Sequence, residues 1–160
     1  MNHDQLWIER AGAQHLDALI AFNKAMAIET EAVSLNPAVL ASGVAAVLND
    51  SDKGMYFIAY AGDPNCTDQA VVAGALMITF EWSDWRNGRF WWIQSVYVIP
   101  QRRRMGVYRS LHDHVRRMAQ ADEQACGIRL YVERDNTVAQ ETYENLDMYE
   151  THYRMYEEVF

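Results

Sequence analysis

The chain has 160 residues, half of them hydrophobic, which is the length and composition of one domain with a sizeable core. Its formal net charge of -8 results from 14 basic and 22 acidic residues. This balance argues against nucleic acid as a partner, because phosphate binding needs a basic face. An acidic surface suits cationic or amine-bearing small molecules instead. We therefore expect one domain over residues 1–160.

The sequence also bears on compartment and metal content. No stretch is long and apolar enough to span a bilayer, and the first ten residues lack the basic-then-apolar pattern of an export signal. Cys66 and Cys126 have neither metal-ligand spacing nor a disulfide framework. His112 and His114 would diverge on a helix, because they are two positions apart. We expect a cytoplasmic protein with no membrane partner and no metal.

The first fifty residues predict a strand followed by two helices. The run LWIER at 6–10 has the composition of a short strand. Residues 14–27 place apolar side chains on one helical face. Residues 36–50 begin with Asn36 and Pro37, a pair typical of a helix start, and continue with valine and leucine at helical spacing.

Three strands are predicted next. Residues 54–62 and 70–82 are apolar, and the break between them is too short for a crossover helix, so we expect them to pair antiparallel. Asn87 and Gly88 form the dipeptide favoured in tight hairpin turns. Residues 89–99 follow as a long strand rich in aromatic and β-branched side chains.

The hydrophobic period changes after this strand. Apolar residues recur at helical spacing from 107 to 118, and residues 127–133 then alternate as a strand, an order that permits parallel pairing with the preceding strand. Asn136 opens a short helix over 136–146, and residues 148–159 alternate as a last strand. The predicted order is strand, two helices, three strands, helix, strand, helix, strand.

Three consecutive arginines, Arg102 to Arg104, lie between the strand that ends near Val98 and the helix that begins near Val107. A helix start presents backbone N–H groups without intrahelical acceptors and attracts anions. Gly106 allows close backbone approach, and guanidinium forks suit a pyrophosphate. The alternative, a solvated loop that neutralises nearby acids, is less favoured by this strand-turn-helix context. The missing Gly-Lys-Ser/Thr and the single glycine exclude a Walker loop and a dinucleotide fingerprint.

The same turn resembles the pyrophosphate loop of the GNAT N-acetyltransferase superfamily. That loop reads Arg/Gln-x-x-Gly-x-Gly/Ala after a strand, often with a proline three residues earlier. Pro100, Arg103 and Gly106 match it, whereas Tyr108 stands where a small residue is usual.

A second segment and the element order extend the resemblance over almost the whole chain. Asn136, Ala139 and Tyr143 resemble the family's Asn-x-x-Ala-x-x-x-Tyr segment. The resemblance implies an α+β fold with a mixed, mostly antiparallel sheet and flanking helices. Two central parallel strands, ending near Val98 and Glu133, are expected to splay apart and admit a pantetheine arm.

By this resemblance the co-substrate is acetyl-CoA. Backbone groups at the end of the long strand would pair with the pantetheine arm, and N–H groups of the following turn would hold the pyrophosphate. The implied acetyl-CoA-binding residues are Val96, Tyr97, Val98, Arg103, Arg104, Met105, Gly106, Val107, Tyr108, Asn136 and Tyr143.

Acyl transfer from a thioester to an amine needs a base and an acid. A primary alkylamine, with a pKa near ~10.4, must lose a proton before it attacks, and a donor assists the departing thiolate. Tyr143 matches the family position from which a phenol often supplies that proton; the alternative is a packing role. Glu81, at a strand end, is the candidate base, and the alternative is a solvated carboxylate.

Candidate acceptor contacts come from two segments. Trp82 and Trp85, at a strand end and in the turn after it, suit a cationic substrate, although surface packing explains them as well. Glu29 and Glu31 lie in the segment that covers the acceptor site in relatives. Solvated helix-end charges are the alternative for each of them.

The sequence thus predicts an N-acetyltransferase that moves an acetyl group from acetyl-CoA to a primary amine of a small molecule by direct attack in a ternary complex. A protein amine is the alternative acceptor. A homodimer is a possible assembly of the chain. The alternative class is a non-catalytic acyl-CoA-binding sensor or interaction module.

Overall fold

The computed structural model describes residues 5–63 and 70–160, so Cys66 lies outside the described residues. The chain forms two compact units, Met1–Leu130 and Tyr131–Phe160. The first unit contains a sheet and three helices, and the second contains one helix and the C-terminal tail.

The first unit is built on a five-stranded sheet in the order β1-β2-β3-β4-β5. Its strands are β1 (Leu6–Arg10), β2 (Met55–Ala61), β3 (Val71–Ser83), β4 (Gly88–Val98) and β5 (Ala125–Leu130). The first four pair antiparallel, and β5 pairs parallel to β4. The parallel pair follows from the helix between β4 and β5, because a crossover returns the chain to the same end of the sheet. The predicted mixed, mostly antiparallel sheet is confirmed.

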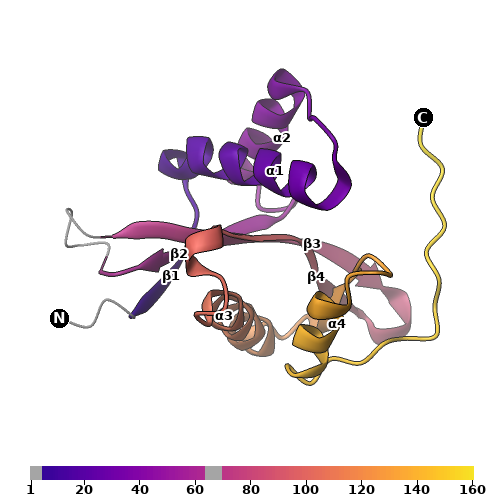
Figure 1. Ribbon diagram of the computed structural model, residues 1–160. Coiled ribbons are helices and arrows are strands. Elements are labelled where there is room, and N and C mark those ends of the chain that lie inside the picture. Colours follow the sequence, from indigo (N-terminus) through magenta and orange to yellow (C-terminus); the bar gives the residue numbers. More distant parts are fainter. Residues whose placement is uncertain (1–4, 64–69) are drawn as a thin grey trace. The chain divides into compact units, whose positions relative to one another are not determined.

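Helices cover both faces of this sheet (Figure 1). The helices α1 (Leu16–Glu31) and α2 (Pro37–Asn49) lie on one face, and α3 (Val107–Ala121) lies on the other. Single 3-10 turns occupy Ala13–His15, Asp84–Arg86 and Pro100–Arg102. The core on the α3 side buries Phe57, Leu76 and Leu111, each with no exposed surface. A second core beneath α1 and α2 buries Leu19 and Ile58.

Local sequence signals set several boundaries. The side chain of Asn36 accepts hydrogen bonds from the N–H groups of Ala38 and Val39, so the predicted cap and proline do begin α2. The β3–β4 hairpin turns through a 3-10 segment, and Asn87 follows in the left-handed region with φ of 46°. Asparagine tolerates this conformation better than most residues, which explains its place before Gly88 at the start of β4.

The two parallel strands, β4 and β5, are paired over only part of β4. Their register runs from Arg89 opposite Ala125 to Ile93 opposite Leu130. The antiparallel register shifts at the same point, where Met77 pairs with Ser95 but Ile78 pairs with Ile93, so Gln94 is a bulge in β4. A bulge bends its strand and increases the local twist. β4 continues to Val98, past the end of its register with β5 at Ile93. The predicted splaying of the two strands around a pantetheine arm stays a prediction.

The end of β5 and the tail differ from the prediction. β5 ends at Leu130, three residues before the predicted end at Glu133, and the second unit holds α4 (Thr137–Glu144). The predicted strand over 148–159 is wrong, because no strand forms there. Tyr149, Tyr153 and Met155, which would share one side of such a strand, are 85%, 69% and 61% exposed. Residues that favour strands do so because they fit a pleated, half-buried surface, and these exposed side chains do not lie on such a surface.

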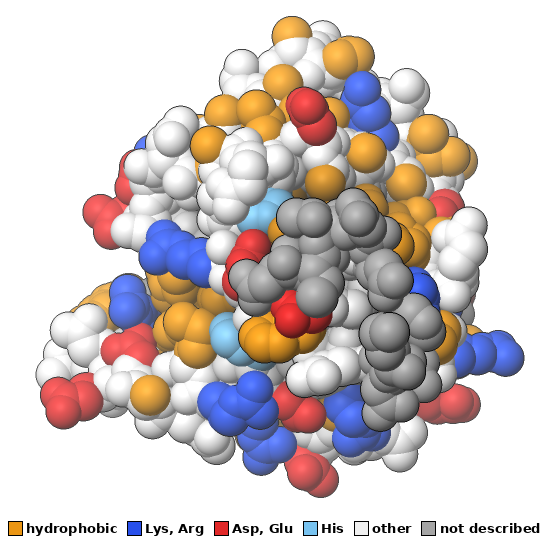
Figure 2. Space-filling view, turned by 90° about the vertical axis from the view of Figure 1, so that its left-hand side faces the viewer, with side chains coloured by type: hydrophobic (Ala, Val, Ile, Leu, Met, Phe, Trp, Pro, Cys, Tyr) orange, Lys and Arg blue, Asp and Glu red, His pale blue; other side chains and the backbone are white. Residues whose placement is uncertain are grey.

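The described surface mixes both signs of charge. Figure 2 shows acidic and basic side chains interspersed over one face. None of the helices in the described ranges combines the length and apolarity needed to cross a membrane.

Candidate active site

The turn between β4 and α3 has an unusual backbone. Arg104 and Gly106 both have positive φ, at 63° and 78°. The first hydrogen bond into the helix runs from the N–H of Ser110 to the carbonyl of Gly106 at 2.9 Å. The N–H groups of the first turn therefore have no acceptor within the helix. Left-handed residues next to a helix start form concavities that bind anions.

Gly106 faces open space. A β-carbon built on it would meet no atom within 4 Å, so the turn is bounded by backbone on one side and is accessible on the other. The positive φ accounts for the glycine. This accessible backbone, the helix start and the neighbouring arginines together fit the oxygens of a pyrophosphate.

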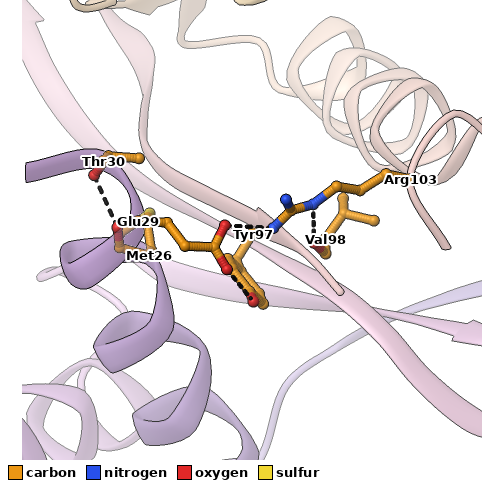
Figure 3. A network of polar contacts seen from close by, with 6 residues as sticks. All are labelled: Met26, Glu29, Thr30, Tyr97, Val98 and Arg103. Atoms are coloured by element: carbon orange, nitrogen blue, oxygen red, sulfur yellow. Dashed lines mark hydrogen bonds and ion pairs between the residues drawn. The ribbon is translucent and has the colours of Figure 1, made fainter. Parts of the chain in front are cut away.

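Arg103 is held by two other elements (Figure 3). Its Nε donates to the carbonyl of Val98 at 3.0 Å, and its Nη2 donates to Oε2 of Glu29 at 2.5 Å. The hydroxyl of Tyr97 donates to Oε1 of the same carboxylate at 3.0 Å. The last turns of α1 are thereby tied to the end of β4. We call Glu29, Tyr97 and Arg103 the carboxylate cluster.

The cluster alters the acidity of two members. The hydrogen bond from Arg103 and then that from Tyr97 lower the pKa of Glu29 below its usual value. Burial, followed by the hydrogen bond to the Glu29 carboxylate, raises the pKa of Tyr97. At neutral pH the cluster therefore contains a carboxylate, a neutral phenol and a guanidinium.

The bulge decides which side chains β4 directs to each face. Ile93, Val96 and Val98 pack into the core on the α3 side. The ring of Tyr97 instead contacts Phe22 of α1, at 5.2 Å between centroids. Strict alternation would place residues 93 and 97 on the same face. Because of the extra residue at Gln94, Tyr97 can reach Glu29.

Gly74 is a site-supporting residue that the sequence analysis did not identify. It pairs with Val98, and a β-carbon there would lie 2.6 Å from the carbonyl oxygen of Tyr97 and 3.3 Å from Val107. Its missing side chain allows β3, the end of β4 and the start of α3 to approach one another. A glycine in a strand interior is the available signal for such an approach.

Glu81 lies elsewhere on the sheet. It pairs with Phe90, four residues before the bulge, which is about 13 Å along the strand. Its Oε1 accepts a hydrogen bond from Nη1 of Arg129 on β5. The guanidinium of Arg129 also lies over the ring of Phe90, 3.6 Å from its centroid. Arg129, which the sequence analysis did not select, thus holds the candidate base in place.

The remaining acceptor candidates are not brought into one group. Trp82, the second-last residue of β3, is 58% exposed, and Trp85, in the hairpin turn, is 87% exposed. Glu31 is the exposed last residue of α1, two positions beyond Glu29. Among the predicted acceptor residues, Glu29 contacts two predicted acetyl-CoA residues, Tyr97 and Arg103.

The two predicted residues of the second unit lie in α4 and at its start. The Oδ1 of Asn136 accepts a hydrogen bond from the N–H of Ala139 at 3.1 Å, so this residue caps the helix. Tyr143 lies seven positions further along, in the last turn of α4. Burial raises its pKa above the ordinary phenol value, which already lies well above neutral pH, so the phenol is protonated there and can donate a hydrogen bond.

Two other features lie outside this region. An open cavity of about 310 Å³ between β1 and α3 is lined by Trp7, Asp113, His114 and Arg117 among others, and by none of the predicted site residues. Within the described ranges, no group of three or more His, Cys, Asp or Glu side chains is placed to hold a metal ion.

Comparisons with known proteins point to one family. The model of the acetyltransferase (GNAT) family matches residues 23–148. A possible acetyltransferase from Clostridium difficile 630 is similar in structure, with a TM-score of 0.86, 42% identity and 97% of each chain covered. The comparison with curated proteins finds no match.

Two more distant structures are of one enzyme. The aminoglycoside N-acetyltransferase AAC(6')-Iy in complex with CoA has a TM-score of 0.75 at 16% identity, covering 97% of this chain and 95% of that one. Its complex with a bisubstrate analogue, CoA-S-monomethyl-acetylneamine, has a TM-score of 0.76 at 16% identity, covering 98% and 99%. At this identity the likeness is one of fold.

Proposed function

The chain belongs to the acetyltransferase (GNAT) family and is an acyltransferase, and from this premise we propose that it transfers the acetyl group of acetyl-CoA to a primary amine of a small molecule. The transfer is a direct attack within a ternary complex. The proposal treats residues 1–160 as one catalytic domain. It places the enzyme in the cytoplasm, where thiols such as the free Cys126 stay reduced.

One observation carries the donor half of the proposal, namely the way β4 ends. The strand extends to Val98 beyond its register with β5, and an accessible turn and a helix start follow it. Residues 96–98 offer strand backbone to the pantetheine amides, and residues 103–108 offer N–H groups and guanidinium to the pyrophosphate. The open space at Gly106 supports this assignment.

The chemistry requires that the amine lose a proton and that CoA leave as a thiol. We assign the first task to Glu81, directly or through water, with Arg129 as the residue that positions it. The amine nitrogen then attacks the thioester carbonyl, and the tetrahedral intermediate expels the thiolate while the nitrogen loses its second proton to solvent, which leaves the neutral amide. We assign protonation of the thiolate to Tyr143, a neutral phenol at the working pH.

The acceptor class is inferred from charge and from the fold. A net charge of -8 favours a cationic acceptor over an anionic one. The aminoglycoside N-acetyltransferase whose fold this chain shares is described with an acetylneamine analogue, which supports a small molecule over a protein amine. Trp82 and Trp85 are the proposed aromatic contacts, and Glu29 and Glu31 the proposed acidic ones.

The experiment that tests the proposal is a panel assay. The protein is incubated with acetyl-CoA and, separately, with small primary amines, aminoglycosides and lysine-containing peptides, and release of CoA thiol is followed. Release with a small amine supports the proposal. Release only with peptides replaces the acceptor by a protein amine. Binding of acetyl-CoA without release from any member indicates a non-catalytic acyl-CoA-binding module.

A further inference from the structure

The carboxylate cluster joins the two halves of the proposed site. Glu29 belongs to the acceptor side by its place in α1, whereas Tyr97 and Arg103 belong to the donor side, at the end of β4 and in the turn after it. Figure 3 shows the carboxylate pointing at both partners. A single carboxylate thus contacts a residue that the proposed function gives to the pyrophosphate.

The Arg103–Glu29 ion pair is of a kind in which one partner is easily replaced by another ion. Its two side chains are 44% and 40% exposed, and ion pairs at such exposure contribute little net stability, because water screens them. Arg103 uses two of its five N–H groups on Val98 and Glu29. A pyrophosphate carries more charge and more acceptor oxygens than one carboxylate, and it suits a bidentate guanidinium contact.

A pyrophosphate and the Glu29 carboxylate are both negatively charged, so they compete for the guanidinium of Arg103. An anion bound by the turn at Arg104 and Gly106 would lie beside Arg103, and the nearby Glu29 carboxylate would repel it. Tyr97 provides a means of keeping the carboxylate in place without Arg103, because its hydroxyl donates to the other oxygen of Glu29.

We propose that Arg103 leaves Glu29 for the pyrophosphate when the acyl donor binds, and that the Glu29 carboxylate, still held by Tyr97, thereby becomes available to a cationic acceptor. Glu29 is then a coupling residue between the two substrates. It weakens donor binding on its own, and it offers a free negative charge to an amine only after the donor has bound. The inference rests on the proposed function, which supplies the pyrophosphate.

The first test measures CoA affinity by calorimetry. Glu29→Gln keeps an oxygen for Tyr97 but removes the charge that competes for Arg103, so CoA should bind about two- to fivefold more tightly, the range set by an exposed ion pair. Asp17→Asn, which removes an exposed charge from the first turn of the same helix, is the matched control and should leave the affinity unchanged. In an Arg103→Ala background the gain from Glu29→Gln should be smaller, because only the direct repulsion between Glu29 and the pyrophosphate is then removed.

The second test follows the Glu29 carboxyl carbon by NMR during pH titration. Saturation with CoA should raise its pKa towards the ordinary value, because the largest cause of the lowering, the hydrogen bond from Arg103, is lost. Thermal melts of each variant establish that it is folded.

The outcomes separate three accounts. Unchanged or weaker CoA binding by Glu29→Gln, or a Glu29 pKa that stays low at saturation, overturns the exchange and makes Glu29 a residue that positions Arg103. Absence of CoA binding by the unmodified protein overturns the proposed function and the inference with it.

Discussion

At the scale of single residues, the turn after β4 provides the clearest test of donor binding. Gly106 has a positive φ, and a side chain there would extend into the space that we assign to the pyrophosphate. Gly106→Asp should weaken acetyl-CoA binding more than Arg103→Ala does, because it adds a carboxylate next to the phosphates and strains the backbone. Calorimetric titration measures both. Equal affinities for the two variants and the unmodified protein would leave the arginines as ordinary surface charge.

Tyr143 is tested by removal of one oxygen. Tyr143→Phe keeps the ring and its packing but deletes the proposed proton donor. Acetyl-CoA affinity should be retained, and turnover should fall on the order of 10²-fold, a usual loss for a positioned acid. The loss will be smaller if attack by the amine limits the rate. Steady-state rates with a confirmed acceptor measure the effect, and a thermal melt is the control for folding. Undiminished turnover would assign Tyr143 to packing.

Glu81 is tested through the pH dependence of the rate. Glu81→Gln should lower turnover mainly below the pKa of the acceptor amine, since a base is needed least where the free amine is abundant. Arg129→Lys should produce a milder form of the same profile, because lysine keeps the charge but loses the fixed fork that holds Glu81. Rates that match those of the unmodified protein across the whole pH range would remove Glu81 from the mechanism.

At the scale of elements, α3 carries a buried group with a stability cost. His112 is 1% exposed, and neither of its ring nitrogens has a hydrogen-bond partner in the described part of the chain. Burial lowers its pKa below the unfolded value of 6.5, with Arg116 and Arg109 lowering it further and Asp113 opposing them. Burial and Arg117 lower the pKa of His114 in the same way.

Both lowered pKa values predict acid destabilisation. The unfolded chain binds protons at these sites more readily than the folded one, so stability is full above pH 6.5 and falls as the pH drops from there through the folded pKa values. His112→Leu should reduce this fall and raise the free energy of unfolding at neutral pH by about 1 kcal/mol, because an unsatisfied buried polar group is removed. Urea unfolding at pH 7.5 and 5.5 measures both effects. A variant with the same pH dependence as the unmodified protein would contradict this reading of His112.

The elements also show how far sequence patterns reach. Cap residues, strand composition and the change of period predicted nine elements in their correct order, because each signal is local. The bulge at Gln94 was not predicted, because it depends on how two strands pair and leaves no mark in the sequence of either. The tail over 148–159 alternates like a strand, yet its residues do not form one. Alternation indicates a suitable pattern but does not supply a partner strand.

The predicted site shows the same limit. The pattern Pro100, Arg103, Gly106 located the turn, and the structure shows the left-handed backbone there. The contact between Glu29 and Arg103 joins residues 74 positions apart and was not predicted, although both had been selected for other reasons. The pairing of Glu81 with Arg129 was missed for a similar cause. Long-range ion pairs follow from the packed fold, whereas sequence motifs report short-range geometry.

At the scale of the whole molecule, the acidic charge and the family fold agree with a proposed site that has a donor half and an acceptor half. The donor half of the proposed site consists of β4, the turn after it and α3. These three elements are consecutive in the sequence. The acceptor half draws on α1 and the β3–β4 hairpin, whose exposed aromatic and acidic side chains suit a cation in a protein of net charge -8.

The most direct measurement is of the two products together. The protein is incubated with acetyl-CoA and the small-amine panel, and the free CoA and acetylated amine are quantified by mass spectrometry. Transfer in a ternary complex predicts equal amounts of CoA and of one N-acetylated small amine, with little CoA formed when the amine is omitted. Acetyl-CoA that binds but yields no acetylated amine from any member of the panel would contradict the account.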